Sequence, residues 1–183
     1  MDVKEKLLSS KILYRGKILR LKLDRVELPN GRITVRETVK HPNSVAVIPV
    51  NKEGKLILIA QYRHSAGEVL LEVPAGTMRE GEPAEECARR ELREETGYEA
   101  GSLKELLGCY LAPGYSTEFI RIFLATNLRY KGQKLESNEQ IKLSPITLEE
   151  AIEKVKKGEI KDAKTISSLL FLRLVKSEEP KVL

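Results

Sequence analysis

The chain has 183 residues, a formal net charge of +5 and 41% hydrophobic residues. This composition excludes a disordered chain, and no apolar run approaches the roughly 20 residues that a membrane-spanning helix needs. The length fits one compact domain with a small appended element, and residues 1–17 lack the unbroken apolar stretch of a secretion signal. Two cysteines, Cys87 and Cys109, are too few for a disulfide framework, so we expect a reduced, cytoplasmic protein.

The first third of the chain reads as strands. Between Lys17 and Lys40, two stretches of strand-like residues flank Pro29-Asn30-Gly31, which predicts an antiparallel hairpin. Residues 44–50 and 56–62, with a turn between them, predict a second strand pair, and residues 69–73 predict a short strand.

The stretch Pro83–Thr96 is the clearest helix of the sequence. Pro83 suits the first helical position, Glu85 and Glu86 favour the positive end of the helix dipole, and Gly97 is placed to end it. Two further strands are predicted after it, over residues 106–111 and 119–126.

Helices close the chain. Thr147 and Glu150 form a capping-box pattern that predicts a helix ending near Gly158. Asp162 is placed to cap a third helix over residues 165–175, with an apolar face at helical spacing. That face consists of Ile166, Leu169, Leu170 and Leu174. Strands followed by helices, with one helix between, favour an α+β fold with a mixed-sheet sandwich over a repeated βαβ array.

Charge is unevenly distributed along the chain. Residues 1–63 hold 14 Lys and Arg against 6 Asp and Glu, whereas residues 72–105 hold 10 Glu against 5 Lys and Arg. This order suits cations held beside an anionic ligand. The excess of Glu (24, against 3 Asp) together with abundant Lys also hints at a thermophilic source.

Three glutamates share one flank of the predicted acidic helix. Glu91 and Glu95 lie one turn apart on nearly the same line, and Glu94 lies beside Glu91. Such carboxylates repel each other unless a positive group lies between them, and Mg²⁺ prefers oxygen ligands of this kind. The alternative is a solvated helix face in which Arg89 and Arg90 form exchangeable ion pairs with glutamates one turn away.

The spacing around this helix decides between these alternatives. It reads Gly76, five residues, Glu82, seven residues, Arg90-Glu91-Leu92, one residue, Glu94-Glu95, one residue, Gly97 and Tyr98. This pattern resembles the signature box of the Nudix hydrolases, which cleave a nucleoside diphosphate linked to another moiety. Tyr98 alone departs from it, where the family usually has an aliphatic residue. The resemblance implies a Nudix-type α/β/α sandwich with a mixed β-sheet over residues 43–183, preceded by an N-terminal β-hairpin element over residues 1–42.

The resemblance also implies a metal site. Glu91 and Glu95 match the main Mg²⁺ ligands, with Glu94 assisting, the Ala75 carbonyl as a backbone ligand and Mn²⁺ as a possible substitute. Arg90 is expected to pair with Glu82 or Glu94 and to orient the carboxylates. The catalytic residues that the resemblance implies by position are Glu139, Glu94 and Arg90.

Four features beyond the box are similar to the ADP-ribose pyrophosphatase branch of the family. They are Glu72-Val73-Pro74-Ala75-Gly76, Gln61-Tyr62-Arg63, Pro113 at 16 residues beyond Gly97, and the loop Pro113-Gly114-Tyr115-Ser116-Thr117-Glu118. The likeness implies that Arg63 and Arg36 contact the diphosphate, and that Gly114 and Glu118 contact the terminal ribose. Arg36 could instead be an ordinary strand-surface residue. Arg79 departs from the branch, which often has Glu there.

A general base and a partner complete the expectations. Members of the branch carry a glutamate on a loop after the last long strand; Glu139 matches best, and Glu136 is the alternative. Relatives form dimers through their N-terminal strands, so we expect a homodimer in which residues 1–42 contact the partner.

The resemblance implies Mg²⁺-dependent cleavage of ADP-ribose and related ADP-sugars to AMP and ribose 5-phosphate. Another nucleoside diphosphate derivative remains open as substrate, as does a non-catalytic nucleotide- or RNA-binding module. The modest net charge and the sparse aromatic residues, 3 Phe, 6 Tyr and no Trp, argue against a nucleic-acid partner.

Overall fold

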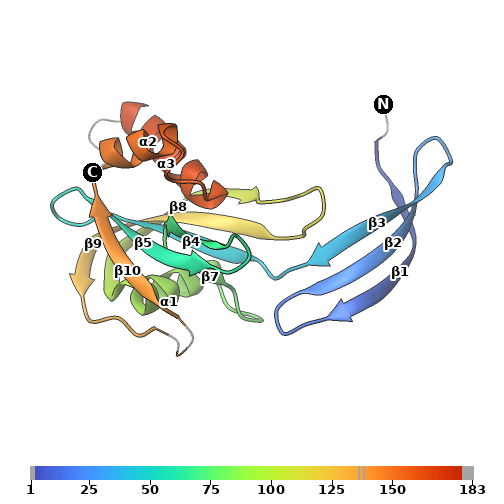
Figure 1. Ribbon diagram of the computed structural model, residues 1–183, viewed down its shortest axis with the longest axis horizontal. Coiled ribbons are helices and arrows are strands. Elements are labelled where there is room, and N and C mark those ends of the chain that lie inside the picture. The colour runs from blue at the N-terminus through green and yellow to red at the C-terminus, as the bar shows by residue number, and fades with distance from the viewer. Residues whose placement is uncertain (1–2, 136, 138, 179–183) are drawn as a thin grey trace. The chain divides into compact units, whose positions relative to one another are not determined.

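The computed structural model describes residues 3–135, 137 and 139–178, over which the chain forms ten strands and three helices (Figure 1). The strands are β1 (Lys6–Arg15), β2 (Arg20–Glu27), β3 (Ile33–Lys40), β4 (Ser44–Pro49), β5 (Leu56–Arg63), β6 (Glu68–Glu72), β7 (Ala75–Thr77), β8 (Tyr98–Tyr110), β9 (Phe119–Tyr130) and β10 (Ile141–Ile146). The helices are α1 (Ala84–Thr96), α2 (Leu148–Lys156) and α3 (Ala163–Glu178). Two compact units result: residues 1–43 with 109–120, and residues 44–108 with 121–183.

The first unit is built on an antiparallel sheet in the order β1-β2-β3. β2 and β3 flank the predicted turn, where Gly31 adopts the left-handed φ of 81°. The sheet has one strand more than the predicted hairpin. All ten residues of β1 are exposed, so it lacks the buried-and-exposed alternation that makes a strand recognisable in a sequence.

The segment 109–120 is joined to β3 by backbone hydrogen bonds. The N–H of Val39 donates to the carbonyl of Tyr115 at 2.7 Å, and the N–H of Thr117 donates to the carbonyl of Val39 at 3.0 Å. The loop that begins at Pro113 therefore lies against the end of the N-terminal sheet.

The second unit has helices on both sides of its strands. Its strands form the orders β10-β5-β6 and β7-β4-β9-β8. α1 covers one side, and α2 and α3 lie on the other (Figure 1). This arrangement confirms the expected α+β sandwich.

β4 and β5 are not the hairpin pair that the sequence predicts. An isolated bridge pairs Val50, the residue after β4, with Leu56. β4 itself lies between β7 and β9, and β5 lies between β10 and β6. All six residues of β4 are buried, as in a central strand that is covered on both faces. β10 was not predicted as a strand. It contains Pro145, which a sheet tolerates at an edge such as this one.

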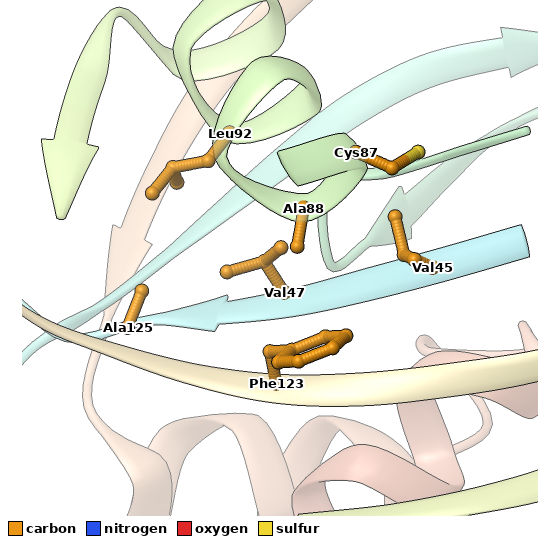
Figure 2. Packing of buried hydrophobic residues seen from close by; sticks show 7 residues of the cluster. All are labelled: Val45, Val47, Cys87, Ala88, Leu92, Phe123 and Ala125. Carbon is orange, nitrogen blue, oxygen red and sulfur yellow. The ribbon is translucent and has the colours of Figure 1, made fainter. Parts of the chain in front are cut away.

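α1 packs on the sheet through a small apolar stripe. Cys87, Ala88 and Leu92 of the helix meet Val45 and Val47 of β4 and Phe123 and Ala125 of β9 (Figure 2). The helix ends at Gly97 with a φ of 77°, as predicted. Its start differs by one residue, because Pro83 has an extended ψ of 141° and serves as the N-cap, not as the first helical residue.

The last two helices begin as predicted. Thr147 and Glu150 form a reciprocal capping box at α2, and the Asp162 carboxylate accepts the N–H of Thr165 at 2.9 Å at the start of α3. The predicted apolar face of α3 is partly wrong, because Leu170 and Leu174 are exposed. The residues of α3 that are buried are Thr165, Ser168, Leu169 and Leu172. Two small polar residues on the buried face conceal it from a reading based on apolar periodicity alone.

Among the described residues, none of the helices combines the length and apolarity that a membrane crossing requires.

Candidate active site

The strand β7 and the helix α1 meet at Gly76 and Glu91. A Cβ atom placed on Gly76 would lie 2.0 Å from Cδ of Glu91 and 2.1 Å from its nearer carboxylate oxygen. Only glycine leaves room at this point for the carboxylate to rest against the backbone. The glycine that opens the sequence pattern therefore seats one of its acids.

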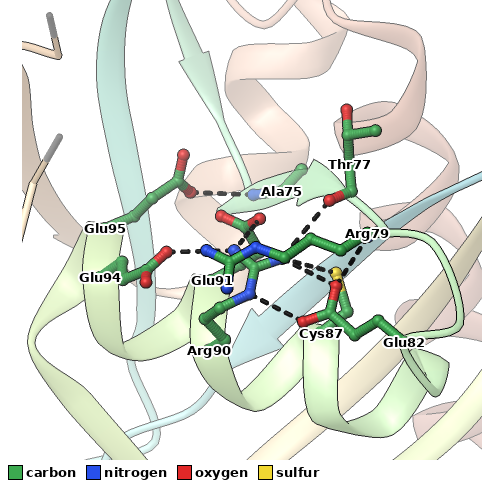
Figure 3. A network of polar contacts seen from close by, with 9 residues as sticks. All are labelled: Ala75, Thr77, Arg79, Glu82, Cys87, Arg90, Glu91, Glu94 and Glu95. Carbon is green, nitrogen blue, oxygen red and sulfur yellow. Dashed lines mark hydrogen bonds and ion pairs between the residues drawn. The ribbon is translucent and has the colours of Figure 1, made fainter. Parts of the chain in front are cut away.

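Arg90 binds three glutamates at once (Figure 3). Its Nε and Nη2 donate to the two oxygens of Glu82 at 2.8 and 3.0 Å. Its Nη1 donates to Glu91 at 2.6 Å and to Glu94 at 3.1 Å. The Glu82 carboxylate also accepts the backbone N–H of Arg79 at 2.9 Å. The bonds from Arg90 lower the pKa of Glu82 to about 2, so this carboxylate stays charged and holds the guanidinium in place.

Glu95 lies in an environment that disfavours its charged form. Its side chain is buried, with the residue 3% exposed, and it accepts the N–H of Ala75 at 2.9 Å. Burial, together with the charges of Glu91 and Glu139, nevertheless raises the pKa of Glu95 to about 8. A positive group near Glu95 would favour the charged carboxylate and lower its pKa.

Glu91 is perturbed in the same direction. Burial raises its pKa, the charges of Glu94 and Glu139 add to the effect, and Arg90 opposes it. The half-buried Glu139 therefore acts on both Glu91 and Glu95, although it is separated from α1 by more than 40 residues of chain. The charge of Glu139, which comes from a different segment, therefore adds to the repulsion between the acids of α1.

A second charged cluster lies at the end of β6. Glu72 is fully buried, at 0% exposure, and accepts hydrogen bonds from Nε and Nη2 of Arg63, both at 2.8 Å. Lys164 of α3 also binds it. Burial alone would raise the pKa of Glu72, but Arg63 and Lys164 outweigh that effect and lower it. Arg63 is thus held in a fixed orientation, and its charge is felt by Glu95.

The comparisons with known proteins agree with this geometry. Residues 40–169 match the NUDIX domain, and residues 5–39 match the nucleoside diphosphate sugar hydrolase N-terminal domain. The chain belongs to the Nudix family.

Individual relatives cover nearly the whole Nudix chain. It is 39% identical to an ADP-ribose pyrophosphatase of Bacillus subtilis (strain 168), over 94% of this chain and 95% of the relative. It is 37% identical to a methanol dehydrogenase activator of Bacillus methanolicus, over 93% of each chain. A crystal structure of an ADP compounds hydrolase superposes with a TM-score of 0.87 at 24% identity, covering 98% of this chain and 97% of that one, which shows the shared fold.

Nudix hydrolases generally need a divalent metal. In the described part of this chain, no three His, Cys, Asp or Glu side chains are already arranged as a metal-binding group. Glu91 and Glu94 instead contact Arg90. The donor set nevertheless fits such an ion. It offers closely spaced carboxylates on one edge of α1, beside the backbone of Gly76. Two of these carboxylates, those of Glu91 and Glu95, have raised pKa values.

Three of the other sequence-predicted residues, Arg36, Gly114 and Glu118, belong to the first unit. Arg36 forms an exposed ion pair with Glu5 at 2.6 Å, and the Glu118 carboxylate lies 3.8 Å from Nδ1 of His41. Glu136, the alternative base, lies outside the described residues.

The contact between Glu72 and Lys164 was not predicted from the sequence. Glu72 was identified there only as part of a branch-specific pentapeptide. The available signal was a charged residue at the end of an apolar strand, directly before Val73, where the chain is buried. No spacing rule links it to a lysine 92 residues later.

Proposed function

We propose that this Nudix chain is a Mg²⁺-dependent pyrophosphohydrolase that cleaves ADP-ribose, and related ADP-sugars, to AMP and ribose 5-phosphate or the matching sugar phosphate. The observation that carries the proposal is the pair of acids Glu91 and Glu95, whose pKa values are raised by burial and further by the charge of Glu139. The name of the Bacillus subtilis relative and the branch-specific motifs support ADP-ribose as the substrate.

In this proposal the metal site consists of Glu91 and Glu95, assisted by Glu94 and the Ala75 carbonyl. Bound Mg²⁺, or Mn²⁺ in its place, would neutralise diphosphate charge and lower the pKa of a water molecule. Arg90 orients the acids, because it holds Glu91 and Glu94 with one nitrogen while Glu82 holds its other edge. Its role is positional, since it is occupied by carboxylates.

Glu139 is the proposed general base. Its charge adds to the burial that raises the pKa of both Glu91 and Glu95, and in this role it would take a proton from an attacking water. Arg63 is the proposed contact for the diphosphate, and Arg36 a second one. Gly114 and Glu118 are the proposed contacts for the terminal ribose, and a Cβ added to Gly114 would have no atom within 4 Å, so the backbone there is open to a ligand.

We also propose that the protein acts as a homodimer through its N-terminal sheet. Large apolar side chains are exposed along β1, its following turn and β3: Leu7, Leu8, Ile12, Leu13, Tyr14, Ile18, Leu19, Ile33 and Val35. A second copy of the chain is the partner that would cover them. Both cysteines are free thiols, in keeping with a cytoplasmic location.

A substrate panel tests the proposed reaction. The purified chain is incubated with Mg²⁺ and ADP-ribose, a dinucleotide, a GDP-sugar or a nucleoside triphosphate, and the products are separated by chromatography. We expect ADP-ribose to be cleaved with the highest kcat/KM, giving AMP and ribose 5-phosphate in equal amounts. If a triphosphate were cleaved fastest, the proposed substrate would be wrong but the proposed metal site would stand. If no compound were cleaved, the proposal that the chain is an enzyme would be wrong.

A further inference from the structure

Lys164, at the start of α3, is a partly buried lysine with no part in the reaction proposed above. Its side chain is 11% exposed. Its ammonium group contacts the buried carboxylate of Glu72 and lies 3.0 Å from that of Asp162. Burying an ammonium group is costly even when it is paired, and a neutral residue of similar length would fill the same space. The position of this charge therefore calls for an explanation.

The carboxylate of Glu72 is shared between two cations. Its Oε1 accepts Nε of Arg63, and its Oε2 accepts both Nη2 of Arg63 and Nζ of Lys164. The two parallel bonds fix the plane of the guanidinium. They use one edge of Arg63 and leave the opposite edge, Nη1, outside this contact, on a side chain that is 35% exposed.

The charges of the cluster balance only with the lysine in place. Arg63 and Lys164 are matched by Glu72 and Asp162, and the charge of Arg63 also reaches Glu95. Without Lys164, two carboxylates would face one guanidinium. Glu72 would then neutralise Arg63 more completely, and the local potential would oppose an anion.

The same turn of α3 also holds the chain that leads into the metal site. The N–H of Val73 donates to Oγ1 of Thr165 at 2.9 Å, and this hydroxyl donates to Asp162 at 2.6 Å. Val73 and Thr165 are both fully buried. The start of α3 therefore clamps the end of β6 through its backbone and through its one buried carboxylate.

We propose that Lys164 is a positioning residue for diphosphate recognition: by sharing Glu72 with Arg63, it fixes the orientation of the guanidinium and preserves its positive charge for the substrate. The inference rests on the proposed function, in which Arg63 contacts the diphosphate. Lys164 itself touches no substrate and acts through Glu72.

The test compares Lys164 in the full-length protein with Lys161, which lies just before α3. Lys164→Met removes the charge from Glu72, and Lys161→Met removes a lysine that binds the exposed Glu68 at 2.7 Å. We expect Lys164→Met to raise KM for ADP-ribose about tenfold with kcat within about twofold of wild type, because binding and not chemistry is weakened. Lys161→Met should leave both constants unchanged, and Lys164→Arg should return KM to within about threefold of wild type.

A double-mutant cycle shows whether the lysine acts through Glu72. In a Glu72→Gln background, Lys164→Met should change KM by less than about twofold. The double variant removes one negative and one positive charge together, so it can still be measured if Lys164→Met alone does not fold. An unchanged KM in a folded Lys164→Met protein, an equal effect of Lys161→Met, or a tenfold effect that persists in the Glu72→Gln background would each overturn the proposal.

Failure of the proposed function is distinguishable from failure of this inference. If wild-type protein does not cleave ADP-ribose, the substrate is wrong. The same variants are then compared on whichever diphosphate the panel identifies, because the contact with Arg63 concerns the diphosphate alone. The same KM split is expected there, and its absence would overturn the role of Lys164.

Discussion

At the scale of single residues, the proposed reaction depends most on Glu139. Its charge is felt by Glu91 and Glu95, and a glutamine keeps the size of the side chain while losing its ability to accept a proton. We expect Glu139→Gln to lower kcat for ADP-ribose by about two orders of magnitude or more, with KM little changed. Steady-state kinetics measures both. If Glu139→Gln kept the turnover of the wild type, the role of general base would belong to Glu136 or to a glutamate of α1.

Glu82 provides a pH-dependent test of the network around Arg90. Its folded pKa of about 2 lies below the ordinary value of 4.5, so the charged form stabilises the folded state. The contribution is fully present above about pH 4.5 and is lost as the pH falls toward 2. Glu82→Gln should therefore cost on the order of 2 kcal/mol at pH 6 and almost nothing near pH 2.

Thermal unfolding across this pH range measures the difference between wild type and Glu82→Gln. The matched control is Glu85→Gln on the same helix, whose pair with Arg89 is exposed and should contribute little at any pH. A cost for Glu82→Gln that stayed constant down to pH 2 would argue that packing, and not charge, holds this residue.

At the scale of elements, the glycines at the two ends of the box have different roles. The atoms nearest to a Cβ on Gly76 belong to the flexible end of Glu91. Gly97, in contrast, has a φ of 77°, and a Cβ there would lie 2.7 and 2.8 Å from backbone atoms of Gln133 and Gly132. Gly76→Ala should lower kcat at least about tenfold by displacing Glu91, while changing the free energy of unfolding by less than about 1 kcal/mol.

Gly97→Ala should instead affect the free energy of unfolding more than kcat. The left-handed backbone and the close backbone neighbours should cost about 2 kcal/mol or more of stability. Chemical denaturation and steady-state kinetics of both variants separate the two effects. Equal destabilisation by both substitutions would contradict the assignment of Gly76 to the seat of Glu91.

The elements also show what the sequence could predict. Local chemistry was sufficient for α1 and α2, since Gly97 and the Thr147–Glu150 box act within one turn of the chain. It was insufficient for β1, which has no buried face, and for the pairing of β5 with β10, which lies far along the chain. The spacing of Glu91 and Glu95 located the acids, but the contact of Glu72 with Lys164 depends on how α3 meets β6, which no local pattern encodes.

At the scale of the whole molecule, the exposed apolar surface of the N-terminal sheet predicts self-association. Ile33 and Val35 alternate along β3 on one face and are both about half exposed. Sedimentation velocity at micromolar concentration should show a dimer, and Ile33→Lys with Val35→Lys should shift it toward monomer. Lys40→Glu is the control, because Lys40 is exposed on the opposite face of the same strand, and this variant should remain a dimer. A wild-type monomer would contradict the proposed partner.

The decisive measurement for the metal site is a crystal structure with Mg²⁺ and a non-hydrolysable ADP-ribose analogue. We expect metal ions bound by Glu91 and Glu95, with the diphosphate against them and Arg63 in contact with it. Carboxylates that remained on Arg90 or pointed into solvent, with no ion between them and the analogue bound elsewhere, would show that these acids do not hold a metal for catalysis.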